Sequence, residues 1–233
     1  DFIKIVNSIK ETADKSGVQI ITGDTKVVER GKGDKIFINT TGFGEVNSNG
    51  KIAVENIKPG DKIIVNGYLA QHGMAIMSQR EGLEFESTII SDTTNLNYIA
   101  NDLLNNFGNM IRFFRDATRG GLSSVLSEIA ADINMGVTLS ERDLPLEKQV
   151  AAACEILGLD PMYVANEGVF ITIVDPEVAE SVLKMMLQDE KGKNSAIIGE
   201  ITIDHPTKVV MNSLVGGKRI VSPLIGEQLP RIC

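Results

Sequence analysis

The chain has 233 residues, 42% of them hydrophobic, and a formal net charge of −8, so it can bury one large core or two smaller ones. The acidic balance and the absence of Trp argue against a protein that binds nucleic acid, because clustered Lys and Arg supply most of the attraction to phosphates. No apolar run is long enough to span a bilayer and no signal peptide is recognisable, so we expect a cytoplasmic protein without a membrane partner.

The first segment of the chain is expected to form a helix and then two strands. Apolar residues recur at helical spacing from Phe2 onward, and Gly17 is typical of a helix end. Residues 18–22 and 35–41 are rich in β-branched side chains, which favours strands. A turn is expected at residues 23–26, directly after the first of these strands.

The rest of the chain mixes helices and strands after a loop-like stretch at residues 45–60. Such an order predicts an α+β fold, of mixed α/β type, in which helices pack on a sheet. The expected strands cover residues 62–67, 169–174, 197–202 and 208–211. The expected helices cover residues 120–129, 146–157 and 176–187.

The end of the chain differs from everything before it. Residues 222–233 contain two prolines and a glycine and show no periodicity, so we expect a flexible, extended tail. The tail ends in a thiol, Cys233, which is either incidental or a swinging nucleophile, and the mobile setting favours the nucleophile. The predicted organisation therefore has three parts: residues 1–57, residues 58–221 and the tail.

Two charged residues follow the first predicted strand. Asp24 and Lys26 stand two positions apart at a strand end, where a carboxylate and an ammonium group suit magnesium and phosphate. The alternative is an ordinary turn, in which Asp24 caps backbone N–H groups and Lys26 is exposed.

A second cluster precedes the helix predicted at residue 120. Gly120 and Gly121 let the backbone approach a ligand, and Arg119 offers a fork of donors suited to phosphate oxygens. Asp116 and Thr118 add polar groups to the same turn. The alternative, which is compatible with the first, is that Thr118 caps the helix while the glycines form a tight entry.

A third polar pair, Asn166 and Glu167, stands before the strand predicted at residue 169. A carboxylate at the mouth of an apolar strand can act as a proton acceptor, although spacing alone favours a solvated turn. Cys154 is expected to be a small core residue. His72 and His205 are isolated, and no His/Cys spacing typical of zinc occurs.

Together these motifs resemble one known family. Residues 21–28, 115–121, 165–168 and the closing residues 229–233 are similar to those of the HypE hydrogenase maturation proteins. The terminal Pro-Arg-Ile-Cys is the most specific piece. The other motifs are shared with a wider superfamily that includes aminoimidazole ribonucleotide synthetase and selenophosphate synthetase, so the resemblance implies that two-domain fold.

The resemblance also implies an activity. HypE proteins receive a carbamoyl group on the terminal cysteine from the carbamoyltransferase HypF. They then dehydrate it with ATP to a thiocyanate, whose cyanide passes to iron held by a HypC–HypD complex for [NiFe]-hydrogenase. The family is homodimeric, with N-terminal domains pairing their sheets.

By the same resemblance, particular residues acquire roles. The catalytic residues would be Cys233, Glu167 as the base, and Lys26, which would stabilise charge. Asp24 would hold Mg²⁺ or order the phosphates of ATP. The remaining phosphate-side residues would be Asp116, Thr118, Arg119, Gly120, Gly121 and Asn166.

One departure from the family accompanies the match. The family has about a hundred further residues, glycine-rich and acidic, before the first residue of this sequence. We therefore expect an incomplete N-terminal domain, and a truncated chain that by itself binds ATP weakly or not at all and is inactive. Two other functions stay open. One is a different ATP-using member of the superfamily, which would need no terminal thiol, and the other is a non-catalytic docking piece that presents the tail to HypF or HypC–HypD.

Overall fold

The structure of the chain, a computed structural model, describes residues 1–33, 35–82 and 88–226. It divides into two compact units, Asp1–Ser48 and Asn49–Cys233. The predicted boundary between residues 57 and 58 stays a prediction, although Val54 and Ile57 pack in the core of the second unit. In the described ranges, no helix has the length and apolar character needed to cross a bilayer.

The first unit contains one helix followed by irregular chain. Helix α1 (Phe2–Ser16) ends at Gly17, as predicted. The strands predicted at residues 18–22 and 35–41 are wrong, because the described part of this unit contains no ladder. β-branched residues favour extended backbone, but a strand also needs a neighbour to accept and donate its hydrogen bonds.

The second unit is built on a mixed seven-stranded sheet, which confirms the predicted α+β class. Its strand order is β2-β4-β1-β5-β3-β6-β7, and every neighbouring pair is antiparallel except β3 and β6. The strands are β1 (Lys62–Val65), β2 (Ile111–Asp116), β3 (Gly136–Ser140), β4 (Phe170–Val174), β5 (Ala196–Thr202), β6 (Val209–Asn212) and β7 (Lys218–Val221). The sequence predicted β1, β4, β5 and β6 but not β2, β3 or β7.

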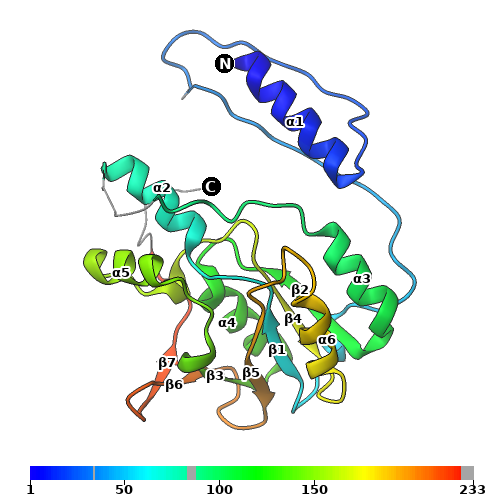
Figure 1. Ribbon diagram of the computed structural model, residues 1–233, viewed down its shortest axis with the longest axis vertical. Helices are drawn as coiled ribbons and strands as arrows, with labels where there is room; N and C mark the ends of the chain where they lie inside the picture. The colour runs from blue at the N-terminus through cyan, green and yellow to red at the C-terminus, as the bar shows by residue number, and fades with distance from the viewer. Residues whose placement is uncertain (34, 83–87, 227–233) are drawn as a thin grey trace. The chain divides into compact units, whose positions relative to one another are not determined.

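Helices cover both faces of this sheet (Figure 1). The helices are α2 (Gln71–Glu81), α3 (Asn97–Phe107), α4 (Gly121–Ile133), α5 (Lys148–Leu157) and α6 (Ala179–Met186). Short 3₁₀ turns occur at Val54–Asn56, Gly108–Met110, Glu141–Asp143 and Pro161–Tyr163. Helix α6 begins later than predicted, because Asp175 accepts the N–H groups of Glu177 and Val178 and holds residues 176–178 in a turn.

The side chains of β1 point alternately to the two faces of the sheet, and both faces are covered by helices. Ile63 and Val65 pack in the cluster that contains α4, whereas Ile64 packs in the cluster that contains α3 and α6. All three side chains are fully buried, and burial of each contributes about 1.5–3 kcal/mol. A strand buried on both faces reads as a continuous apolar run, which is how the sequence reveals it.

The register of three strands defines two ends of the sheet. Asp116 pairs with Phe170, and Ile111 pairs with Val174 at the other end of the same two strands. Strand β1 lies on the other side of β4 and also runs antiparallel to it. We call the end that contains the loops after β1 and β2 and the loop before β4 the site end, and the other the opposite end.

Candidate functional site

Loops from distant parts of the second unit meet at the site end. Asn66, which follows β1, donates from Nδ2 to the carbonyl oxygen of Gly168 at 3.0 Å and accepts the N–H of Phe170 at 2.8 Å. The N–H of Ala117, after β2, donates to the carbonyl oxygen of Val169 at 3.0 Å. The loops after β1 and β2 are therefore both bonded to the segment that carries Glu167.

The turn after β2 holds the predicted phosphate residues. Thr118 Oγ1 donates to Asp116 Oδ2 at 2.6 Å, so the expectation that Thr118 caps α4 is wrong. The N-cap is Gly120, with φ of 68°, and no side chain caps the helix. Among the described residues no side chain caps the first turn of α4, and an uncapped helix start is a usual feature of an anion site. Arg119 is exposed beside it.

Gly121 makes the closest approach in this turn. A Cβ atom at this position would lie 2.6 Å from the carbonyl oxygen of Met162 and 2.7 Å from that of Val164. Its φ of 60° also disfavours other residues. The glycine is therefore required by the chain's own packing, which brings the start of α4 against the segment leading to Glu167.

Asn166 ties the three loops together. Its side chain is 1% exposed. Its Oδ1 accepts the N–H of Ala70 at 2.8 Å, and its Nδ2 donates to the carbonyl oxygens of Ala117 at 2.8 Å and Val164 at 3.2 Å. The amide is therefore engaged within the chain and joins the loops that carry the predicted phosphate residues.

Glu167 follows directly and is half-buried. Its backbone N–H donates to both carboxylate oxygens of Asp92, at 3.1 and 3.3 Å. The structure therefore fixes the peptide of Glu167 through its neighbours, while none of the described hydrogen bonds or ion pairs involves its side-chain carboxylate.

The base of the predicted tail lies at the start of α4. Buried Ser123 donates from Oγ to the carbonyl oxygen of Ser222 at 2.6 Å, and the N–H of Leu224 donates to Ser124 Oγ at 3.5 Å. Cys233 lies outside the described residues. The nine residues after Leu224 can span at most about 30 Å when extended, so the anchor limits where the thiol can go.

Asp24 and Lys26 belong to the first unit, whereas the residues described above belong to the second. Both are exposed, and Asp24 Oδ1 accepts the N–H of Thr25 at 2.8 Å. The turn predicted at residues 23–26 is wrong, because the chain there is irregular and forms no turn. In the described ranges, no group of three or more His, Cys, Asp or Glu side chains is arranged to hold a metal ion. Mg²⁺ bound through substrate phosphates needs only one or two protein carboxylates, which a single Asp24 fits.

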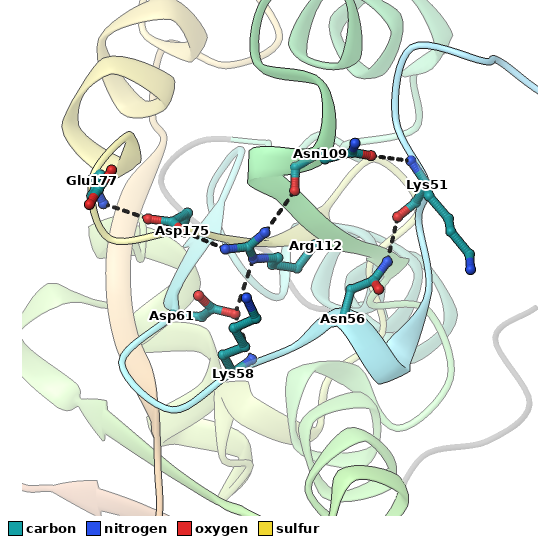
Figure 2. Close-up of polar contacts among 8 residues, drawn as sticks. All are labelled: Lys51, Asn56, Lys58, Asp61, Asn109, Arg112, Asp175 and Glu177. Carbon is teal, nitrogen blue, oxygen red and sulfur yellow. Dashed lines mark hydrogen bonds and ion pairs between the residues drawn. The ribbon is translucent and has the colours of Figure 1, made fainter.

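The opposite end of the sheet carries a different set of charges (Figure 2). Arg112 pairs with Asp175, lies 3.6 Å from Asp61 Oδ2 and donates to the carbonyl oxygen of Asn109 at 2.9 Å. Burial raises the pKa of the Asp61 carboxyl, and the N–H of Lys58 and the charge of Arg112 act against that rise. A shallow cavity of about 280 Å³ beside them is lined by Lys51, Glu55, Asn56, Lys58, Asn109 and Arg112.

Three residues that contribute to the site end were not predicted from the sequence. Asn66 and Asp92 gave no signal, and His72 was regarded as isolated, although its Nδ1 lies 2.9 Å from Ser91 Oγ. Their partners are many residues away, so only the fold reveals them. Cys154, in contrast, is the buried core residue that was predicted, and burial raises the pKa of its thiol to about 11, with a smaller contribution from Asp160.

Comparison with known families covers most of the chain. Residues 58–212 match the family described as AIR synthase related protein, C-terminal domain. Residues 1–46 match the corresponding N-terminal domain family. Both units of the structure therefore have relatives in one two-domain superfamily.

Individual relatives are similar along the whole sequence. The chain is 47% identical to carbamoyl dehydratase HypE of Bradyrhizobium diazoefficiens over 233 residues, which are 100% of this chain and 67% of that protein. Among solved structures, hydrogenase maturation protein HypE in complex with ATP matches 99% of this chain and 70% of its own, at 41% identity and a TM-score of 0.93. A HypE–HypF complex matches 96% of this chain and 72% of its own, at 41% identity and a TM-score of 0.92.

Proposed function

The chain belongs to the HypE family of hydrogenase maturation proteins, and we propose that it carries out the carbamoyl dehydration for which its relatives are named. The reaction uses ATP to convert an S-carbamoyl group on Cys233 into a thiocyanate. The product supplies the cyanide ligand of the iron in [NiFe]-hydrogenase.

The chemistry explains why a nucleotide is consumed. An S-bound carboxamide loses water poorly because hydroxide is a poor leaving group. The amide oxygen attacks the γ-phosphorus of ATP and ADP leaves, so the oxygen becomes part of a phosphate. The nitrogen loses its two protons, the C–O bond breaks, phosphate departs and a C≡N bond remains on sulfur. This sequence needs cationic contacts on the phosphoryl group and a base beside the nitrogen.

Residues of this chain match those needs. Glu167 is the base, and its backbone is fixed by the loops around it. The uncapped start of α4, with Gly120, Gly121 and exposed Arg119, receives phosphate oxygens. Asp116, Thr118 and Asn166 support that turn.

Two residues of the first unit complete the proposal. Lys26 stabilises charge on the transferring phosphoryl group or the amide oxygen, and Asp24 holds Mg²⁺. When bound, Mg²⁺ supplies positive charge to the phosphates and orders them. Both side chains are exposed on the irregular segment after α1, where they are free to meet a ligand.

One observation carries this proposal. The chain that leads to Cys233 is anchored by Ser123 and Ser124, two and three residues after Gly121, and Gly121 packs against the segment that leads to Glu167. A terminal thiol tethered there has the proposed base and the phosphate-binding turn within the reach of its own tail.

The partners of the chain follow from the same reaction. We propose HypF as donor of the carbamoyl group, in line with the solved complex of a relative, and a HypC–HypD complex as acceptor of the cyanide. The first unit exposes apolar side chains, among them Val27, Phe37 and Phe43 at 80% or more, which supports a homodimer through this unit. The setting proposed for the reaction is the cytoplasm.

The test follows the thiol by intact mass spectrometry. The full-length protein is incubated with HypF, carbamoyl phosphate and ATP, and we expect a carbamoyl adduct on Cys233 that then loses the mass of one water. Cys233→Ala should accept no adduct, whereas Cys154→Ala, at a buried thiol, should behave as the unmodified protein. An adduct on the Cys233→Ala protein would refute the assignment.

A further inference from the structure

An irregular segment of the second unit, residues 88–96, lies at the site end and has no role in the reaction described so far. We call it the strap. Ile89 is buried in the cluster formed with α2 and α5. Ser91 Oγ lies 2.9 Å from His72 Nδ1, and Asn95 accepts a hydrogen bond from Lys191. A segment without secondary structure that is held at several points is a fixed part of the site.

Asp92 is where the strap meets the proposed base. Its two carboxylate oxygens lie 3.1 and 3.3 Å from the backbone nitrogen of Glu167, whose N–H they accept. Burial raises the pKa of the Asp92 carboxyl, while the N–H groups of Glu167 and Gly168 act against that rise. Hydrogen bonds from backbone N–H groups to a carboxylate are charge-assisted and therefore among the stronger ones.

Gly168 shows how closely the strap and the base segment approach. A Cβ atom at this position would lie 1.9 Å from the carbonyl oxygen of Asp92 and 3.1 Å from Thr94 Cγ2. No side chain fits in that space. The residue after Glu167 is therefore a glycine that lets Asp92 reach the peptide before it.

His72 supports the strap from the helix side. Its Nδ1 shares a hydrogen bond with Ser91 Oγ, which also lies 2.7 Å from Thr93 Oγ1. Its Nε2 is buried and has no hydrogen-bond partner within the described ranges. Ser91, the residue before Asp92, is thus itself held in place by hydrogen bonds.

We infer that Asp92 is a positioning residue for the dehydration, acting only through Glu167 by fixing the peptide that carries it. The inference rests on the proposed function, in which Glu167 is the base. A carboxylate on a half-buried segment can swing with its peptide, and an error of about 1 Å in a reacting group costs roughly 100-fold in rate. Asp92 removes that freedom on the strap side, as Asn66 and Asn166 do on the sheet side.

The experiment measures single-turnover dehydration by the full-length protein, first carbamoylated by HypF and then given saturating ATP. We expect Asp92→Ala to slow the loss of water roughly 100-fold, while acceptance of the carbamoyl group and the affinity for ATP stay unchanged. Asp92→Asn keeps an acceptor oxygen for the Glu167 N–H and should be intermediate. Normal dehydration by Asp92→Ala would overturn the inference.

A matched carboxylate serves as the control. Asp175 also accepts a backbone N–H, that of Glu177 at 3.0 Å, but at the opposite end of the sheet. Asp175→Ala should lower stability and leave the dehydration rate of the folded protein unchanged. If both variants slow dehydration in proportion to lost stability, Asp92 is merely structural and the inference fails.

A double mutant separates this inference from the function on which it rests. In a Glu167→Gln background Asp92→Ala should cause no further loss, because there is no base left to position. A further loss of similar size would show that Asp92 acts independently of Glu167. If Glu167→Gln alone dehydrates normally, the proposed function loses its base. If Glu167→Gln stops dehydration while Asp92→Ala dehydrates at the normal rate, only the inference about Asp92 fails.

Discussion

The two ends of strands β1, β2 and β4 hold charged groups in contrasting ways. At the opposite end, Arg112 is 11% exposed and Asp61 is 2% exposed, and the guanidinium contacts Asp61, Asp175 and a backbone carbonyl (Figure 2). At the site end, the backbone around Glu167 is fixed by hydrogen bonds, but its carboxylate has no such partner within the described part of the chain.

This difference separates a structural cluster from a reactive one. Charges that satisfy one another fix the strands and have little capacity left for a ligand. A carboxylate whose peptide is held while its oxygens remain available is pre-organised for proton transfer at little cost during the reaction. We expect substitutions at the opposite end to change the free energy of unfolding and substitutions at the site end to change the rate.

The largest expected effect is that of removing the proposed base. Glu167→Gln keeps the size and the backbone bonds of the residue but cannot accept a proton at neutral pH. We expect dehydration to fall by about a thousand-fold, since a positioned base typically contributes 10²–10⁴-fold. Intact mass spectrometry should show a carbamoyl adduct that persists on Cys233 without losing water.

The stability of the same variant is its control. Because the side chain makes no described hydrogen bond, the midpoint of thermal unfolding should match that of the unmodified protein. A large fall in that midpoint would place Glu167 among the structural charges and remove the contrast between the two ends.

The second prediction concerns the cluster at the opposite end. Arg112→Met removes the cation from the buried Asp61 and the half-buried Asp175, which should lower the free energy of unfolding by about 3–5 kcal/mol. Chemical denaturation measures this change. As a control, Lys62→Ala breaks the partly exposed pair with Glu200 and should cost at most about 1 kcal/mol.

The stability deficit of Arg112→Met should also change with pH in a definite direction. Burial already raises the pKa of Asp61, and the loss of Arg112 moves it further upward. A carboxyl group whose pKa is higher in the folded state than in the unfolded state contributes stability below its unfolded pKa and loses it as the pH rises through the folded value. The deficit of Arg112→Met should therefore shrink as the pH is lowered toward 4. A deficit that grows in acid would contradict the assignment.

The features that could be predicted from the sequence are those that depend on residues close together along the chain. Strands β1 and β4 read as apolar runs, α5 ends at Gly158 as expected, and Cys154 was placed correctly in the core. The paired glycines Gly120 and Gly121, the N-cap and the first residue of α4, marked its start. Each of these features depends on neighbours within one element.

The parts that the sequence missed depend on partners far along the chain. Strand β2 contains Arg112 and Arg115, so its sequence lacks the apolar pattern of a buried strand. The two arginines pair with Asp175 and Glu128, which lie outside β2 and become their neighbours only in the fold. Asp92 stands 75 positions before Glu167 in the sequence, so no spacing rule joins them. The strands predicted in the first unit failed for the converse reason, since they have strand propensity but no ladder in the described residues.

The smallest expected effect tests the close contact between the strap and the base segment. Gly168→Ala places a methyl group 1.9 Å from the carbonyl oxygen of Asp92, so one of the two segments must move. We expect a loss of about 1–3 kcal/mol in stability from overpacking. We also expect dehydration to slow by about 10-fold or more, because the displaced peptide carries Glu167.

A second glycine at the same end of the sheet gives the matched control. A Cβ atom at Gly67 would meet no heavy atom within 4 Å, so Gly67→Ala should leave both stability and rate close to those of the unmodified protein. The informative comparison in Gly168→Ala is between the loss of stability and the loss of dehydration rate. A variant that is less stable but dehydrates at the normal rate when folded would mean that the strap can move without disturbing Glu167, and the site end would then be held by Asn66 and Asn166 alone.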